Sequence, residues 1–347
     1  MATKIEKLVA DYDHQNFLRW LEEFPDQVEK ACRLGQNINE APAPPAGLVV
    51  GGMGGSGISG DLVASYCRND AEIPVYTVRD YNLPAWVDSS FLFTAVSYSG
   101  NTEETLSLYQ QAVERGCGLL VVSGGGQLID RADEAGHPVI KIPSGQPPRA
   151  SAPYLFIPLL YLLDKMGCCH GPSENDLGET LKHLGNIVEE LAPGKEANFA
   201  FELVRKVYDK IPVIYGSAGM TGTLALRLKN QFNENAKMIA LANELPELNH
   251  NEIMGWQQMA ESPENYIALF LRDSGEHERI KKRFSISGEI LSSSVAGIET
   301  MRSRGDSLFC RMMTLMLISD YTSYYAALLR HKDPSAIENI EALKKKL

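Results

Sequence analysis

Residues 91–105 read FLFTAVSYSGNTEET, a stretch that joins an apolar segment to a polar turn and a helix start. The segment from Phe91 to Val96 is aromatic, aliphatic or β-branched and has the length of a buried strand. Thr102 precedes two glutamates and the apolar positions Leu106 and Leu108, a pattern that predicts a helix with a capping box at its N-terminus. The turn therefore follows a strand and opens a helix.

The polar side chains of this turn predict a phosphate-binding site. A helix N-terminus presents free N–H groups and about half a unit of positive charge. The hydroxyl groups of Ser97, Ser99 and Thr102 would add donors, so that a phosphomonoester could bind without a metal ion or a lysine. For this segment alone, an ordinary serine-rich turn with a capped helix is the alternative.

Length and charge narrow the classes of protein that fit. The 347 residues are enough for two domains, each with its own core. With 33 basic and 44 acidic side chains the net charge is −11, which argues against nucleic acid as a partner. The longest apolar stretch, Tyr154 to Leu163, has about half the length that a bilayer span requires. We expect a soluble cytoplasmic protein that does not bind membranes.

The six cysteines are scattered without a C-x-x-C pair, a usage that fits a reducing compartment. The segment Cys168-Cys169-His170 could suggest a metal site, but no second pair of ligands has a suitable spacing. We therefore predict no metal and interpret these residues as structural.

Four regions can be distinguished along the chain. Strand-length apolar runs alternate with helix-length segments, which predicts an α/β fold with doubly wound, mainly parallel sheets flanked by helices. The regions are an N-terminal helical segment with a proline-rich linker (1–45), a first α/β domain (46–170), a connecting helix (171–194) and a second α/β domain with C-terminal helices (195–347).

The second domain repeats the pattern of the first. Residues 211–222 (IPVIYGSAGMTG) follow the same order of strand, Gly/Ser turn and helix as residues 48–57 (LVVGGMGGSG). A duplication is the natural interpretation, although two similar turns could also arise by chance in an α/β protein. In the first copy we expect the turn to precede a helix that begins at Asp61.

The glycine loop allows two interpretations. Gly52-x-Gly54-x-x-Gly57 satisfies the dinucleotide fingerprint, with Asp80 after the next strand, and so leaves open an NAD-dependent oxidoreductase. The glycines match this pattern in more than one register, however, and neither a Walker A lysine nor a nucleophile elbow is present. In the other interpretation Gly54, Gly55 and Ser56 close on a sugar ring, because this loop and Ser97 follow strands of one sheet and face one crevice.

Four motifs together resemble the sugar isomerase (SIS) domain family. They are GGMGGSG at 51–57, SYSGNTEET at 97–105, NENAK at 233–237 and ELPELNHNE at 244–252. Within that family the chain is similar, over nearly its full length, to the bifunctional phosphoglucose/phosphomannose isomerases. The resemblance implies two SIS-type subdomains and a reaction on hexose 6-phosphates without a cofactor or metal.

The resemblance also assigns roles to single residues. It implies that Glu234 is the catalytic base, that His250 opens the sugar ring, and that Arg149 and Lys332 belong to two further family motifs, QPPR and KDP. An aldose–ketose isomerisation fits these residue types, since one carboxylate can carry a proton between neighbouring carbons while a cation stabilises the enediolate. Lys332 would assist His250 in ring opening.

Each of these residues also has a structural alternative, which for Arg149 is to cap the edge of a core. Glu234 could be a solvated loop carboxylate, and His250 could be a hydrogen-bonded turn residue. Lys332 follows a long apolar helix predicted over 308–329, where a cation complements the helix dipole. We expect Glu244, Glu247 and Glu252 to bond the backbone or a partner subunit rather than the substrate.

The resemblance further implies a homodimer in which the histidine of each active site comes from the other subunit. Whether mannose 6-phosphate is a substrate depends in the family on a C-terminal hydroxyl, which the segment 322–325 (TSYY) does not identify. A non-catalytic SIS sensor that binds a phosphosugar and regulates a partner is the main alternative, because it would need Ser97, Ser99 and Thr102 but neither Glu234 nor His250.

Overall fold

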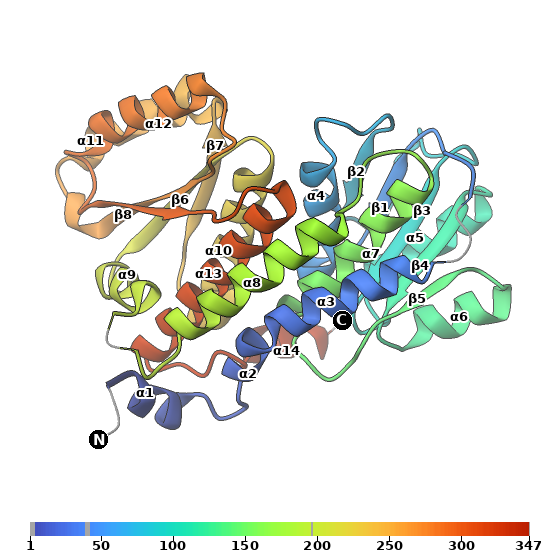
Figure 1. The fold of residues 1–347 in the computed structure, drawn as a ribbon, viewed down its shortest axis with the longest axis horizontal. Coiled ribbons are helices and arrows are strands. Elements are labelled where there is room, and N and C mark those ends of the chain that lie inside the picture. Colours follow the sequence, from blue (N-terminus) through green and yellow to red (C-terminus); the bar gives the residue numbers. More distant parts are fainter. Residues whose placement is uncertain (1–3, 39–41, 196, 347) are drawn as a thin grey trace. The chain divides into compact units, whose positions relative to one another are not determined.

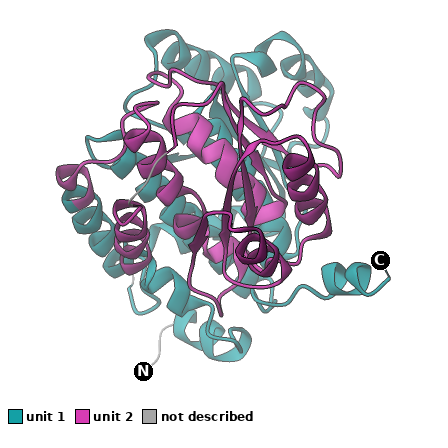
Figure 2. Ribbon diagram, turned by 90° about the vertical axis from the view of Figure 1, so that its right-hand side faces the viewer, with its two compact units in different colours: residues 1–24, 178–347 teal, residues 25–177 magenta. Residues whose placement is uncertain are grey.

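The computed structural model describes residues 4–38, 42–195 and 197–346, which form two compact units (Figures 1 and 2). Unit 1 contains residues up to Phe24 and from Gly178 onward, and unit 2 contains Pro25 to Leu177. Helix α8 (Glu174–Glu190) falls within the range predicted for the connecting helix. The four-region division remains a prediction, and residues 39–41 of its linker lie outside the described residues.

Unit 2 is built on a five-stranded parallel sheet, here called sheet A, with the strand order β2-β1-β3-β4-β5. Gly51, the last residue of β1, lies opposite Ala95, so β3 continues two residues further to Ser97. This arrangement confirms the predicted doubly wound α/β fold. The strands are β1 (Leu48–Gly51), β2 (Val75–Val78), β3 (Leu92–Ser97), β4 (Gly118–Ser123) and β5 (Val139–Lys141).

Helices cover both faces of sheet A (Figure 1). Val49 and Phe93 point to one face, where they form a core with Leu108 and Leu128 of α5 and α6. On the other face Gly60 of α4 lies against Val50, because side chains alternate along a strand. The helices of this unit are α3 (Phe24–Gln36), α4 (Gly54–Tyr66), α5 (Glu103–Glu114), α6 (Gln127–Ala135), the short η1 (Pro148–Ala150) and α7 (Ala152–Lys165).

The expected start of α4 was wrong. The helix begins at Gly54, seven residues before Asp61. Glycine has a low helix propensity, so the first turn reads as loop, but tertiary contacts override this preference. The Ser59 hydroxyl donates to the Ser56 carbonyl at 2.5 Å, and Gly57 packs closely on the Gly52 carbonyl.

Unit 1 contains a second parallel sheet, sheet B, with the order β7-β6-β8-β9. This order is the same as β2-β1-β3-β4 in sheet A, which supports the predicted duplication. The strands are β6 (Ile211–Ser217), β7 (Leu241–Leu245), β8 (Tyr266–Arg272) and β9 (Ile298–Arg302).

The centre of unit 1 is α13 (Leu308–Leu329), whose bounds agree with the predicted range. It is predominantly apolar and nearly all of its residues are buried, as expected of a helix at the centre of a domain. Its buried Asp320 pairs with Arg227 of α10, with 3.0 Å between Nη2 and Oδ2, and accepts a hydrogen bond from Gln231. This ion pair fixes α10 against α13.

Unit 1 contains further helices around α13 and on sheet B. They are α1 (Lys4–Tyr12), α2 (Leu18–Glu22), α9 (Phe199–Val207), α10 (Met220–Ala236), η2 (Glu247–His250), α11 (Glu252–Met259), η3 (Pro263–Asn265), α12 (Glu278–Leu291) and α14 (Glu338–Lys344). Among the described residues, no helix combines the length and apolar character needed to cross a membrane.

Candidate active site

The predicted phosphate turn starts from a buried serine at the end of β3. Ser97 is buried, and its Oγ lies 2.9 Å from Oγ1 of Thr102 and 3.1 Å from the Gly100 N–H, which donates to it. Thr102 is the N-cap residue of α5, but its side chain makes no cap bond. The predicted capping box was therefore wrong, because the Thr102 hydroxyl bonds to Ser97 instead of to the helix.

A neighbouring loop holds this turn in shape. The exposed Ser99 accepts the N–H of Asn101 at 3.3 Å, and the Asn101 side chain accepts the N–H of Gln127 at 3.1 Å. Gly100 has a φ of +67°, and a Cβ at this position would lie 1.6 Å from the Gly125 carbonyl oxygen. The turn therefore requires glycine for both conformation and space.

Replacing Gly100 with alanine is expected to disrupt the turn and lower the free energy of unfolding by about 3 kcal/mol or more, through overpacking against backbone and a positive φ. Chemical denaturation measures this loss. Gly116→Ala is the matched control, since Gly116 also has a φ of +67° but its nearest neighbour would be 3.8 Å away. The Gly116→Ala variant should lose only about 1 kcal/mol of the free energy of unfolding. Equal losses for both variants would contradict the packing argument.

Three segments that are distant in sequence meet at the carboxyl ends of β1 and β3. The Ser56 hydroxyl accepts the N–H of Tyr98 at 3.1 Å, and the Tyr98 hydroxyl accepts the N–H of Gln146 at 2.9 Å. A Cβ on Gly55 would lie 3.2 Å from the backbone nitrogen of Arg149. Beside it, Gly54 is exposed, with a φ of +52°.

This place is the switch point of the sheet, where ligands of doubly wound folds bind. Unit 2 thus brings together most of the predicted residues. They are Gly54, Gly55, Ser56, Ser97, Ser99, Thr102 and the buried Arg149.

The residues that match the dinucleotide fingerprint do not have the contacts that a dinucleotide-binding site requires. Arg79, rather than Asp80, contacts the glycine helix, donating to the Gly57 carbonyl at 3.1 Å and pairing with Asp61. The Asp80 carboxylate accepts the N–H of Tyr81 at 2.5 Å within its own turn. This geometry does not favour the ribose contact that the fingerprint requires of Asp80.

The predicted catalytic base lies in unit 1. Glu234 is half-buried in the last turn of α10, and hydrogen bonds hold its two asparagine neighbours. Asn233 donates to the Met238 carbonyl at 2.8 Å, and Asn235 donates to the Ser323 hydroxyl at 3.0 Å. The backbone around Glu234 is therefore fixed by both neighbours.

Lys237 connects the segment of Glu234 with the C-terminal KDP motif. Its Nζ donates to the carbonyl oxygens of Asn235 at 3.1 Å and Asp333 at 2.5 Å. Lys332 itself is exposed, and its N–H caps α13 by donating to the Ala327 carbonyl at 2.9 Å. Unit 1 therefore brings the two motifs together, while the structural alternative for Lys332 stays open.

His250 is the last residue of η2 and is exposed. Two residues later, the Glu252 carboxylate has several hydrogen-bond partners. Glu252 accepts hydrogen bonds from the Tyr215 hydroxyl and from Asn243 Nδ2, the latter at 2.5 Å. Trp256 in turn donates to the Tyr215 hydroxyl at 2.9 Å. Burial and the bond to Glu252 raise the pKa of Tyr215, which keeps this hydroxyl protonated as a donor.

Glu252 therefore anchors the His250 segment to β6 and β7 through side chains, whereas bonds to the backbone or to a partner subunit were expected. Sequence reasoning missed its partners Tyr215 and Asn243, which only the fold brings to it.

Glu234 and His250 lie at opposite edges of sheet B. Helix α10 begins at the carboxyl edge after β6 and extends about 25 Å over its 17 residues, so Glu234 lies near the amino edge. Strand β7 then runs back over about 16 Å, and the Ala218 N–H bonds to the Leu245 carbonyl at the carboxyl edge, where η2 follows. The two residues of one chain therefore cannot both contact one small ligand.

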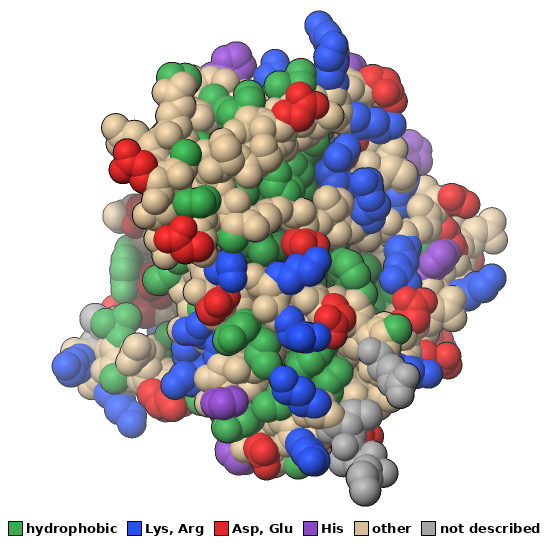
Figure 3. Space-filling view, turned by 90° about the vertical axis from the view of Figure 1, so that its left-hand side faces the viewer, with side chains coloured by type: hydrophobic (Ala, Val, Ile, Leu, Met, Phe, Trp, Pro, Cys, Tyr) green, Lys and Arg blue, Asp and Glu red, His purple; other side chains and the backbone are tan. Residues whose placement is uncertain are grey.

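A groove of about 500 Å³ lies beside η2, between α11 and α12. These helices form the upper part of the face in Figure 3, where Lys and Arg side chains gather beside exposed apolar side chains. The groove is lined by Asn249, Ile253, Arg279, Lys282, Arg283, Ile286, Ser287 and Ile290.

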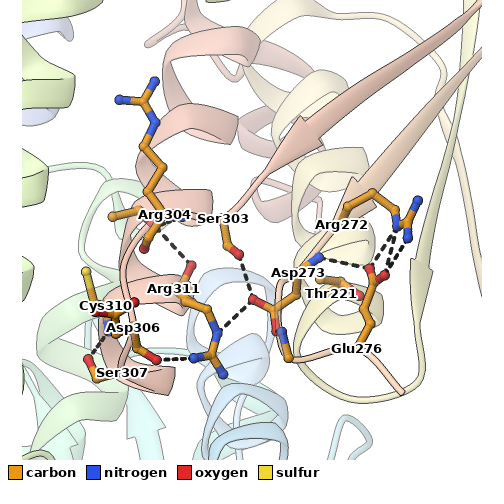
Figure 4. A network of polar contacts seen from close by, with 12 residues as sticks. Thr221, Arg272, Asp273, Glu276, Ser303, Arg304, Asp306, Ser307, Cys310 and Arg311 are labelled. Atoms are coloured by element: carbon orange, nitrogen blue, oxygen red, sulfur yellow. Dashed lines mark hydrogen bonds and ion pairs between the residues drawn. The ribbon is translucent and has the colours of Figure 1, made fainter. Parts of the chain in front are cut away.

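Figure 4 shows the carboxyl edge of sheet B, which differs chemically from that of sheet A. After β8, at the counterpart of the phosphate turn, Asp273 accepts hydrogen bonds from Arg311 at 2.9 Å and from Ser303 at 2.6 Å. Glu276, whose side chain is buried, pairs with Arg272 at 2.7 Å. The protein's own carboxylates occupy this edge, so the duplication repeats the fold but not the phosphate turn.

One group of potential metal ligands occurs among the described residues, namely Glu179, His183 and Cys310. The two Glu179 oxygens accept the N–H groups of Asp306 and Ser307 before α13. Burial raises the pKa of the Cys310 thiol to about 12, so it is a poor ligand at neutral pH. A structural role explains this group, and the absence of a metal stays a prediction.

Comparisons with known proteins agree with this arrangement. Residues 196–347 match the family model described as the bacterial phospho-glucose isomerase C-terminal SIS domain. A bifunctional phosphoglucose/phosphomannose isomerase of Caldicellulosiruptor bescii is 41% identical over 331 residues, covering 93% of this chain and 96% of that protein. The enzyme of the same name from Aquifex aeolicus is 34% identical, covering 90% and 93%.

A solved structure shows the same fold. A hypothetical protein of Thermus thermophilus superposes with a TM-score of 0.72 at 16% identity, covering 99% of this chain and 93% of that one. The chain belongs to the bifunctional phosphoglucose/phosphomannose isomerase family.

Proposed function

We propose that this isomerase interconverts glucose 6-phosphate and fructose 6-phosphate, and also mannose 6-phosphate and fructose 6-phosphate, by proton transfer through an enediolate without a cofactor or metal. The observation that carries the proposal is the meeting of the glycine loop, the Ser97–Thr102 turn and the Arg149 segment at the switch point of sheet A. A cytoplasmic location and a homodimer are part of the proposal.

The substrate phosphate binds at the turn after β3. Ser97 and Thr102 carry two hydroxyl protons, and their mutual hydrogen bond uses only one of them. The other proton is available to a phosphate oxygen, together with Ser99 and the N-terminus of α5. Gly54, Gly55 and Ser56 give the sugar ring access to the backbone beside it.

Glu234 carries the proton between the two carbons, and Arg149 stabilises the negative charge of the enediolate. His250 and Lys332 move protons during ring opening. Because Glu234 and His250 lie at opposite edges of sheet B in one chain, the histidine of each site comes from a second copy. The groove beside His250 is the surface that we assign to this contact, since it places three basic side chains beside exposed apolar ones.

The test is proton NMR of fructose 6-phosphate with the enzyme in deuterated water. The proposal expects glucose 6-phosphate and mannose 6-phosphate to form, with deuterium at C2 of the product, and chelator treatment to leave the rate unchanged. Binding without turnover would support the sensor alternative instead. Formation of glucose 6-phosphate alone would restrict the proposal to one epimer.

Replacing Ser97 and Thr102 together with alanine is expected to raise KM for fructose 6-phosphate at least about tenfold, since hydrogen bonds to a charged phosphate contribute about 1.5 to 3 kcal/mol each. Steady-state kinetics measure this change. Ser107→Ala is the control, because Ser107 lies on the same helix but donates to the Tyr81 carbonyl. A KM of the double variant within about threefold of the wild type would reject this phosphate site.

A further inference from the structure

Two buried cysteines of unit 2 bring their sulfur atoms into close contact. The Sγ atoms of Cys67 and Cys169 lie 2.8 Å apart, although the residues are 102 positions apart in sequence. Cys67 follows α4 as its C-cap residue, and Cys169 lies shortly after the end of α7. A covalent S–S bond is about 2.05 Å long, so a movement of under about 1 Å would complete one.

The surrounding hydrogen bonds hold the two cysteines together without help from the sulfur contact. The Glu72 N–H donates to the Cys168 carbonyl at 2.9 Å. The His170 N–H donates to the Asp70 carboxylate at 3.0 Å, and the His170 ring lies 3.1 Å from the same oxygen. The turn after α4 is thus fastened to the chain on both sides of Cys169.

We propose that Cys67 and Cys169 are a modification site, at which a peroxide converts the two thiols into an intramolecular disulfide. Residue Cys169 is 6% exposed against 0% for Cys67, so its sulfur is the one that meets the peroxide. It attacks one peroxide oxygen, breaks the O–O bond and becomes a sulfenic acid, while the other oxygen leaves as water with the thiol proton.

The second step closes the bond. The sulfur of Cys67 attacks the sulfenic sulfur of Cys169, and the hydroxyl group leaves with the Cys67 proton as a second water. In sum, two thiols lose two electrons and hydrogen peroxide takes them up to form two waters. The contact with Cys169 and burial raise the pKa of the Cys67 thiol, so the reaction is slow at neutral pH.

The disulfide would connect the far ends of two helices whose near ends form the candidate site. Helix α4 begins at Gly54 and Gly55, and α7 begins three residues after Arg149. The bond would close a loop of about 100 residues, which is expected to raise the thermal unfolding midpoint by at least about 5 °C. A reductant should reverse this shift.

The experiment exposes the native full-length protein to hydrogen peroxide for several hours, blocks free thiols in denaturant and maps the peptides by mass spectrometry. We expect the six free thiols to fall by two and a peptide pair linked through Cys67 and Cys169. Cys168→Ser is the matched control and should keep the link, because the Cys168 sulfur faces the Met166 carbonyl at 3.8 Å. Cys67→Ser and Cys169→Ser should each abolish it.

Six free thiols after this treatment would overturn the proposal, as would a link between other cysteines. Sulfinic or sulfonic acid at Cys169 without the link would overturn it too, since Cys67 would then have failed to reach the sulfenic sulfur. The peptide map of the wild-type protein decides between these results even where a serine variant does not fold. None of them depends on isomerase activity.

Discussion

Replacing Glu234 with glutamine is expected to lower kcat for fructose 6-phosphate by about 10²- to 10⁴-fold, because an amide can neither accept nor return the carbon-bound proton. The two side chains have nearly the same shape, and the hydrogen bonds of Asn233 and Asn235 would still fix this turn of α10. The loss should therefore appear in kcat, with KM nearly unchanged.

Two measurements check this expectation. A coupled assay gives kcat and KM, and proton NMR in deuterated water follows the exchange of the C2 proton, which should fall in parallel with kcat. Glu202→Gln is the control, since Glu202 is an exposed carboxylate on α9 of the same unit that pairs only with Arg205 among the described contacts. Turnover of the Glu234 variant within about threefold of the wild type would exclude Glu234 as the base.

The helices and strands that were predicted best from the sequence are those whose own residues determine the local structure. The helix over 308–329 was predicted because its apolar run is long, and in the structure the Ser307 side chain caps its start. The apolar runs at 75–78 and 118–123 form β2 and β4, since both are short runs bounded by turns. In these segments each residue's own preference agrees with the fold.

Predictions failed where a non-local contact decided the local structure. The first turn of α4 reads as loop until its packing on Gly52, Arg79 and the Arg149 segment is known. The capping box at Thr102 was predicted from spacing, whereas the hydroxyl bonds to Ser97, which the end of β3 brings beside it. The partners of Glu252 come from β6 and β7, and no spacing within 244–252 indicates them.

The candidate site follows the same rule. Motif spacing placed the glycine loop and the phosphate turn at one crevice, because parallel strands end at a common edge. Spacing could not show that Glu234 and His250 lie at opposite edges of sheet B, since only the direction of α10 and β7 determines this. The prediction of a shared active site therefore gained a geometric reason that the resemblance alone did not supply.

Mixing two inactive variants is expected to restore activity. If Glu234 of one copy acts with His250 of another, the homodimers of Glu234→Gln and of His250→Ala each contain two defective sites. A mixed dimer contains one site with both replacements and one site with neither. Random pairing makes about half of the dimers mixed, so about a quarter of the wild-type activity should return.

The experiment co-expresses the two variants with different affinity tags and isolates the mixed dimer through both tags, which should raise the recovered activity to about half of the wild type. The control mixes Glu234→Gln with Ser107→Ala, so that subunits exchange but no lost activity can be restored. The activity should then only fall in proportion to the share of Glu234→Gln chains. Absence of recovery in a doubly tagged dimer would mean that Glu234 and His250 act from one chain. This outcome conflicts with about 16 Å of β7 between the two edges, so it would require α10 or η2 to move.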